Sequence, residues 1–116
     1  MKSPITTHVL DTATGKPAAG VHVRLQIWSD AAKEWQKLTE GETNADGRIT
    51  DWLPADKPIA AGVYRVRFDV AAYYKKCGQS TFFPHVPIVF EIRDATQHYH
   101  VPLLLSPYGY STYRGS

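Results

Sequence analysis

The sequence has one cysteine, Cys77, among 116 residues, and it has no run of 18 apolar residues. A single cysteine excludes a disulfide within the chain, and the missing apolar run excludes a membrane-spanning helix. The chain also lacks a large excess of charge of either sign. It has 13 Lys and Arg residues and 11 Asp and Glu residues, which gives a net charge of +2. This balance argues against a nucleic-acid or anionic-membrane partner. The first five residues lead into an alternating pattern without the apolar stretch of a signal peptide, so we expect a cytoplasmic protein.

What the chain does contain is an ordinary globular composition. Hydrophobic residues make up 43% and charged residues 21%, values typical of a folded protein rather than a disordered one. A chain of 116 residues can bury one core without disulfide or metal staples. We therefore expect a single domain over residues 1–116.

Alternation of apolar and polar side chains dominates the chain, and this period of two is typical of half-buried strands. Gly- and Pro-containing turn signals separate the strands, including a loop expected at 84–87. The pattern predicts an all-β, antiparallel sandwich of about eight strands with one short helix. The expected strands are 5–11, 21–28, 35–43, 47–50, 63–70, 88–92, 97–105 and 108–114.

One segment, 70–77, departs from the alternation and predicts the helix. Lys75 and Lys76 suit the negative end of a helix dipole, and Gly78 is a favoured residue just after a helix. Cys77 falls late on this helix with no histidine near it in sequence. We expect a small, partly buried thiol there rather than a nucleophile.

Two strands carry histidines on faces that mix polar and apolar side chains. On the late strand, one face is a core stripe and the other holds His98, His100, Pro102 and Leu104. On the first strand, Thr6, His8 and Leu10 share the face opposite Ile5, Thr7 and Val9. Outward faces of mixed character suggest a surface that a partner subunit covers.

Each of these features also has an ordinary explanation. A histidine on a sheet surface is more often a tolerated surface residue than a functional one. His98 and His100 have a spacing that could chelate zinc, but no Cys or carboxylate cluster supplies further ligands, so we expect no metal. Arg48 after its turn, and the tail 113–116, would by composition alone be solvated surface. Pattern alone therefore stops at a sandwich with an unusual face.

Four motifs resemble those of the transthyretin-related 5-hydroxyisourate hydrolases. They occur in order, span nearly the whole chain, and show no departure at the positions that matter. The motifs are Thr-Thr-His-Val-Leu-Asp at 6–11 with Gly-Lys-Pro-Ala at 15–18, Thr-Asn-Ala-Asp-Gly-Arg at 43–48, Tyr-His-Val-Pro-Leu-Leu-Leu-Ser-Pro-Tyr at 99–108, and Tyr-Arg-Gly-Ser at 113–116.

The resemblance implies a transthyretin-like eight-stranded sandwich with one helix, assembled as a homotetramer that is a dimer of dimers. It implies active sites in a channel between the dimers, lined by the first and the last two strands. The family's catalytic positions fall on His8, Arg48 and His100, and its terminal tetrapeptide contributes Tyr113 and Ser116. The carrier transthyretin shares the fold but lacks these residues, so the chain resembles the enzyme branch.

The implied reaction is hydrolysis of the N1–C6 bond of 5-hydroxyisourate, giving 2-oxo-4-hydroxy-4-carboxy-5-ureidoimidazoline in urate degradation. Ring opening of a cyclic amide needs an activated water, a stabilised oxyanion and a proton for the leaving nitrogen. We expect His8 and His100 to share base and acid work, in an order that the sequence leaves open, and Arg48 to hold the carbonyl oxygen. The resemblance gives Ser116 a relay or water-holding role and Tyr113 a contact with the substrate. It implies no cofactor, and the alternative function is a non-enzymatic carrier of small aromatic ligands.

Overall fold

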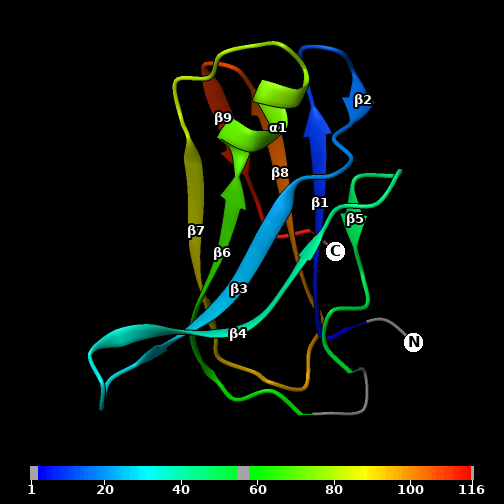
Figure 1. The fold of residues 1–116 in the computed structure, drawn as a ribbon. Coiled ribbons are helices and arrows are strands. Elements are labelled where there is room, and N and C mark those ends of the chain that lie inside the picture. The colour runs from blue at the N-terminus through cyan, green and yellow to red at the C-terminus, as the bar shows by residue number, and fades with distance from the viewer. Residues whose placement is uncertain (1–2, 55–57, 116) are drawn as a thin grey trace.

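The computed structural model describes residues 3–54 and 58–115, and it shows two sheets packed face to face with one helix at an end of the sandwich (Figure 1). The strands are β1 (Ile5–Asp11), β2 (Lys16–Pro17), β3 (His22–Ser29), β4 (Glu34–Glu42), β5 (Arg48–Ile49), β6 (Gly62–Asp69), β7 (His85–Ile92), β8 (Tyr99–Ser106) and β9 (Gly109–Thr112), and the helix is α1 (Val70–Lys76).

The described strands form a sheet of order β2-β1-β8-β9, with β5 paired to the side of β1, and a second sheet of order β4-β3-β6-β7. The all-β sandwich predicted from the alternation is confirmed, and the two-residue strand β2 lies where only a turn was expected. Every described strand pair is antiparallel except β1 with β8, which run parallel. This pair joins the strands that carry His8 and His100.

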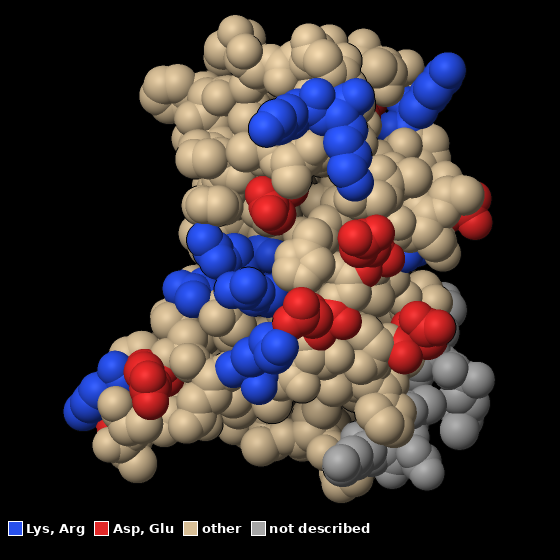
Figure 2. Space-filling view, in the orientation of Figure 1, with Lys and Arg blue, Asp and Glu red and all other residues tan. Residues whose placement is uncertain are grey.

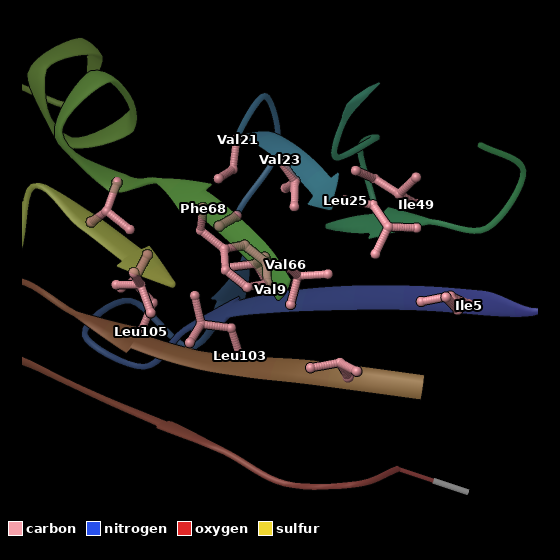
Figure 3. Packing of buried hydrophobic residues seen from close by; sticks show 14 of the residues in the cluster. Ile5, Val9, Val21, Val23, Leu25, Ile49, Val66, Phe68, Leu103 and Leu105 are labelled. Carbon is pink, nitrogen blue, oxygen red and sulfur yellow. The ribbon is translucent and has the colours of Figure 1, made fainter. Parts of the chain in front are cut away.

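The core lies between the sheets and consists of the faces that the alternation predicted to be buried. Figure 3 shows Val66 and Phe68 from one sheet opposite Val9, Leu103 and Leu105 from the other. Each of these five side chains is at most 1% exposed. Burial of one such side chain contributes about 1.5–3 kcal/mol, so the core fixes which face of β1 and β8 points outward.

The helix begins and ends where its end signals lie. The Asp69 carboxylate accepts a hydrogen bond from the amide of Ala72 at 3.4 Å, and Gly78 takes a φ of +70° just beyond the last turn. Cys77 is exposed, so the expectation of a partly buried thiol is wrong. Cys77 is the C-cap residue of the helix, which buries only one face, with Val70 and Tyr74.

Strand β7 begins at His85, inside the segment 84–87 that the sequence predicted to be a loop. Pro87 pairs with Arg67 of β6 without breaking the strand. Strand β7 is at the edge of its sheet, which is where a proline is tolerated within a strand.

The outward face of the β4-β3-β6-β7 sheet carries charges of both signs. In Figure 2, Lys and Arg side chains are interspersed with Asp and Glu side chains rather than gathered into one field. Across the described residues, no helix combines the length and the apolar character needed to cross a bilayer.

Candidate active site

The parallel pairing of β1 with β8 places two histidines on one outward face. Thr6 pairs with His100, and His8 pairs with Pro102, so both histidines project from the side opposite the core. The two positions are one strand and two residues apart, which corresponds to about 8 Å between Cα atoms. A small heterocycle can span that separation.

Strand β5 places Arg48 beside His8, on the side of β1 away from β8. Arg48 is the direct antiparallel partner of His8, and its side chain is exposed while its neighbour Ile49 is buried. Residues of a direct pair share one face, so His8 lies between Arg48 on β5 and the His100 position on β8. The three residues come from segments far apart in sequence.

The turn before β5 explains why Arg48 can lie close to β1 and His8. The Asn44 side-chain oxygen accepts hydrogen bonds from the amides of Asp46 at 2.9 Å and Arg48 at 3.0 Å. Gly47 takes a φ of +73°, and a Cβ there would lie 2.5 Å from the carbonyl oxygen of Val9. Only glycine allows this approach, and the Val9 amide then donates to the Gly47 carbonyl at 2.7 Å.

His8 is half-buried, and its surroundings favour the neutral imidazole. Burial lowers the pKa of His8 below its usual 6.5, and the positive charge of Arg48 lowers it further. A backbone hydrogen bond at Asp46 and the Asp46 carboxylate act in the opposite direction without reversing the shift. A neutral imidazole beside a fixed cation is suited to accept a proton.

His100 lies against the C-terminal tail. The amide of Gly115 donates to the His100 carbonyl at 2.8 Å and forms an isolated bridge with it. A pocket of about 240 Å³ opens beside this contact, between β7, β8 and the tail. Its lining residues are Ile88, Val89, Phe90, Glu91, Tyr99, His100, Val101, Thr112, Tyr113 and Arg114.

Arg114 anchors residues 113–115 through two side-chain contacts. Arg114 donates from Nη2 to the Gln97 side-chain oxygen at 2.7 Å, and its guanidinium lies 4.6 Å from the centre of the Tyr99 ring. These contacts orient Tyr113, which is 57% exposed, beside the pocket that also contains His100.

The structure therefore brings His8 and Arg48 together, places His100 on the same face, and lines the adjoining pocket with Tyr113. Ser116 lies outside the described residues. No role was predicted for Thr6, whose hydroxyl oxygen is 2.7 Å from Nδ1 of His100. Its position two residues before His8, on the same face, was the available signal.

The two histidines with chelating spacing both face Thr6. His98 Nε2 lies 3.2 Å from the Thr6 hydroxyl oxygen, and Nδ1 of His100 contacts the same oxygen. Within residues 3–54 and 58–115, no group of three or more His, Cys, Asp or Glu residues is arranged to hold a metal ion.

Comparison with known proteins gives matches along almost the entire chain. A model of the HIUase/Transthyretin family matches residues 5–115. The 5-hydroxyisourate hydrolase of Mus musculus is 48% identical over 114 residues, which are 98% of this chain and 96% of that protein.

Solved structures match as well. The Klebsiella pneumoniae 5-hydroxyisourate hydrolase has a TM-score of 0.82 at 37% identity, with 97% of this chain and 92% of that chain covered. Sea bream transthyretin in complex with thyroxine has a TM-score of 0.89 at 32% identity, with 97% and 95% covered. Fold and matches together define a transthyretin-like β-sandwich protein. The chain belongs to the HIUase/Transthyretin family.

Proposed function

We propose that this protein hydrolyses 5-hydroxyisourate to 2-oxo-4-hydroxy-4-carboxy-5-ureidoimidazoline by opening the ring at N1–C6. The observation that carries the proposal is the row of side chains on the outward face of β5, β1 and β8. It combines an arginine, a directly paired histidine and a second histidine two residues along. The 48% identity to a hydrolase with this activity supports the same assignment.

Arg48 and His8 act at the carbonyl end of the scissile bond. The guanidinium stays charged throughout and offers a planar set of donors to the C6 oxygen, where negative charge develops as water attacks. His8, kept neutral by burial and by Arg48, takes the proton from that water. One well-placed hydrogen-bond donor to the oxyanion, such as Arg48, lowers the activation free energy by about 3 kcal/mol.

His100 acts at the leaving nitrogen. The Cα atoms of His100 and His8 lie about 8 Å apart, which leaves room for a small ring between the two side chains, so that one imidazole can serve the water at C6 and the other the adjacent N1. When C6–N1 breaks, N1 takes a proton from the protonated His100, which becomes a neutral imidazole. The hydroxyl of the attacking water remains on C6, and the proton of that water remains on His8. Tyr113 contacts the substrate from the adjoining pocket, and Ser116 holds water or relays a proton.

An absorbance assay with freshly generated 5-hydroxyisourate tests the activity. The compound decays without a catalyst, so the expected result is a decay rate that rises in proportion to protein concentration. A rate that equals the uncatalysed decay at every protein concentration would reject the proposal.

The second candidate is a carrier of small aromatic ligands, which the likeness to thyroxine-bound transthyretin favours. A carrier has no need of His8, Arg48 and His100 together. It would bind thyroxine or 5-hydroxyisourate and slow the decay or leave it unchanged. Equilibrium binding of thyroxine, measured beside the decay assay, separates the two functions.

We also propose a homotetramer, a dimer of dimers, in which the outward face of β1 and β8 lines a channel. Leu10 and Leu104 are half-buried on this face beside His8 and His100, although an isolated sheet surface would favour polar side chains there. Light scattering after gel filtration is expected to give four times the mass of one chain. A fully active monomer would contradict the assembly.

A single domain over residues 1–116 and a cytoplasmic location stay predictions. Limited proteolysis tests the first, because one domain resists cleavage along its whole length. Fractionation of the source cells tests the second, and recovery in a membrane or secreted fraction would contradict it.

A further inference from the structure

Two arginines lie directly opposite each other on the outward face of the β4-β3-β6-β7 sheet, on the other side of the sandwich from His8 and His100. Arg24 of β3 is the antiparallel partner of Arg67 of β6, and both alternate with buried residues, so both side chains project outward. Directly paired residues have Cβ atoms about 4.5–5.5 Å apart, and like charges at that separation destabilise a sheet. The pair therefore favours a negative charge beside it.

Within the residues that the structure describes, no group forms a hydrogen bond or an ion pair with either of these two guanidinium groups. Arg65, two residues before Arg67 on the same face, is different. Its Nε donates to the Gln26 side-chain oxygen at 2.7 Å, and its guanidinium lies 4.5 Å from the centre of the Trp35 ring. Burial lowers the pKa of Arg65, and the positive charge of Arg67 lowers it further. The field of Arg67 therefore reaches its neighbour.

The carboxylates next to the arginine pair have other partners. Glu40, which pairs with Arg24 across β4 and β3, binds His22 at 3.0 Å through Oε1. The other oxygen of the same carboxylate binds Lys37. Asp69 follows on β6, and its carboxylate accepts a hydrogen bond from the first turn of α1 at 3.4 Å. The donors of the arginine pair thus stay open to a ligand.

The arginine pair borders a hollow of about 40 Å³ on this face. Its lining residues are His22, Arg24, Arg67, Asp69 and His85. His85 of β7 is the direct partner of Asp69, so the hollow spans β3, β6 and β7. Arg24 and His85 are exposed, which leaves the hollow open to solvent. Four of the five lining side chains can donate hydrogen bonds to an anion.

We propose that this hollow binds a tetrahedral oxyanion of the size of phosphate, which Arg24 and Arg67 hold from two sides. A guanidinium presents a planar fork of donors that matches phosphate oxygens, and two facing forks can hold different oxygens of one anion. The anion supplies the negative charge that the pair lacks. The Asp69 carboxylate repels an anion, so the anion lies at the arginine end of the hollow. His22 and His85 flank it and add positive charge when protonated.

Titration of the full chain with inorganic phosphate at constant pH, followed by NMR of the His22 and His85 ring protons, tests the site. We expect saturable shifts with phosphate and with sulfate, and none with chloride at the same ionic strength. Arg67→Gln is expected to weaken phosphate binding by about 10-fold or more, because it removes a charged donor from a charged acceptor. Arg93→Gln is the matched control, since it removes the same charge from a side chain that is 85% exposed and lies outside the hollow.

Thermal unfolding gives a second readout, because an anion that binds the folded chain raises its melting temperature. We expect phosphate to raise the melting temperature of the unaltered protein and of Arg93→Gln above that in chloride, and to raise that of Arg67→Gln less. The gain is measured within each protein, so a change in the stability of a variant does not affect it. Shifts in phosphate no larger than those in chloride, or equal phosphate binding by Arg67→Gln and Arg93→Gln, would overturn the inference. Neither measurement uses 5-hydroxyisourate, so the result is independent of the proposed function.

Discussion

Gly115 packs directly onto the imidazole of His100. A Cβ built at Gly115 would lie 2.5 Å from Cδ2 of His100, 3.2 Å from Cγ and 3.3 Å from Cβ. The Gly115 amide is held at the same time by the His100 carbonyl at 2.8 Å. Any side chain at 115 must therefore push the tail off β8 or turn the His100 ring away.

Gly115→Ala is expected to lower kcat/KM by about 100-fold while leaving the melting temperature within a few degrees. The methyl group displaces a catalytic ring or the tail beside it, and a shift of about 1 Å has this cost. Gly109→Ala is the matched control, since a Cβ there would meet only the Ser106 hydroxyl at 3.6 Å, an ordinary contact. Equal activity of the two variants would contradict a role for the tail contact.

The pKa of His8 is expected to respond in opposite directions to its two charged neighbours. Arg48→Gln removes a positive charge that lowers the pKa of His8, so that pKa should rise. Asp46→Asn removes a negative charge that raises it, so that pKa should fall further below 6.5. NMR titration of the His8 ring protons measures both shifts, and shifts of the same sign would refute this electrostatic account.

The same shift predicts the acidic side of the pH profile. If neutral His8 is the base, kcat/KM falls as pH drops through the pKa of free His8, and this limb should lie below pH 6.5. Asp46→Asn should move the limb to lower pH. Asp30→Asn, a change of the same charge on the distant β3–β4 turn, should leave it in place. A limb above pH 7 would assign the base to another group.

Removal of residues 115 and 116 is expected to abolish most activity without unfolding the sandwich. Neither residue contributes to the core, but the deletion takes away the amide that ties the tail to His100. Activity by the decay assay and unfolding by circular dichroism would be measured on the same preparation. A truncated protein with unchanged kinetics would remove the tail from the mechanism.

Leu103→Ala is expected to lower the free energy of unfolding by about 2–5 kcal/mol, because it opens a cavity between the sheets. Leu103 is fully buried, whereas Leu38 on β4 is 43% exposed. Leu38→Ala makes the same chemical change and is expected to cost well under 1 kcal/mol. Denaturant unfolding of both variants measures the difference. Equal decreases in the free energy of unfolding would contradict the placement of Leu103 in the core.

Much of the fold followed from alternation, because a strand with one buried face must repeat its side chains with a period of two. That rule identified the buried faces of β1, β6 and β8. It missed the start of β7, since Pro87 reads as a loop unless the strand is known to lie at a sheet edge. It also could not give the parallel pairing of β1 with β8, which depends on contacts between segments some 90 residues apart.

The candidate site divides in the same way. His8, Arg48, His100 and Tyr113 were predicted from motifs, and the structure places them on one face and its adjoining pocket. Thr6 escaped notice because a threonine in a strand is ordinary, and only the register shows its hydroxyl between two imidazoles. The need for a glycine at 115 could not be predicted, because it follows from the pairing of Gly115 with His100 of β8.

The most direct test of the whole account is the decay of 5-hydroxyisourate in the presence of the unaltered protein, Arg48→Ala and His100→Ala, each shown to be folded. We predict fast, concentration-dependent decay with the unaltered protein and a loss of about 100-fold or more in either variant. Near-native turnover in either variant would contradict the claim that these side chains, brought together from distant parts of the chain, form one hydrolytic site.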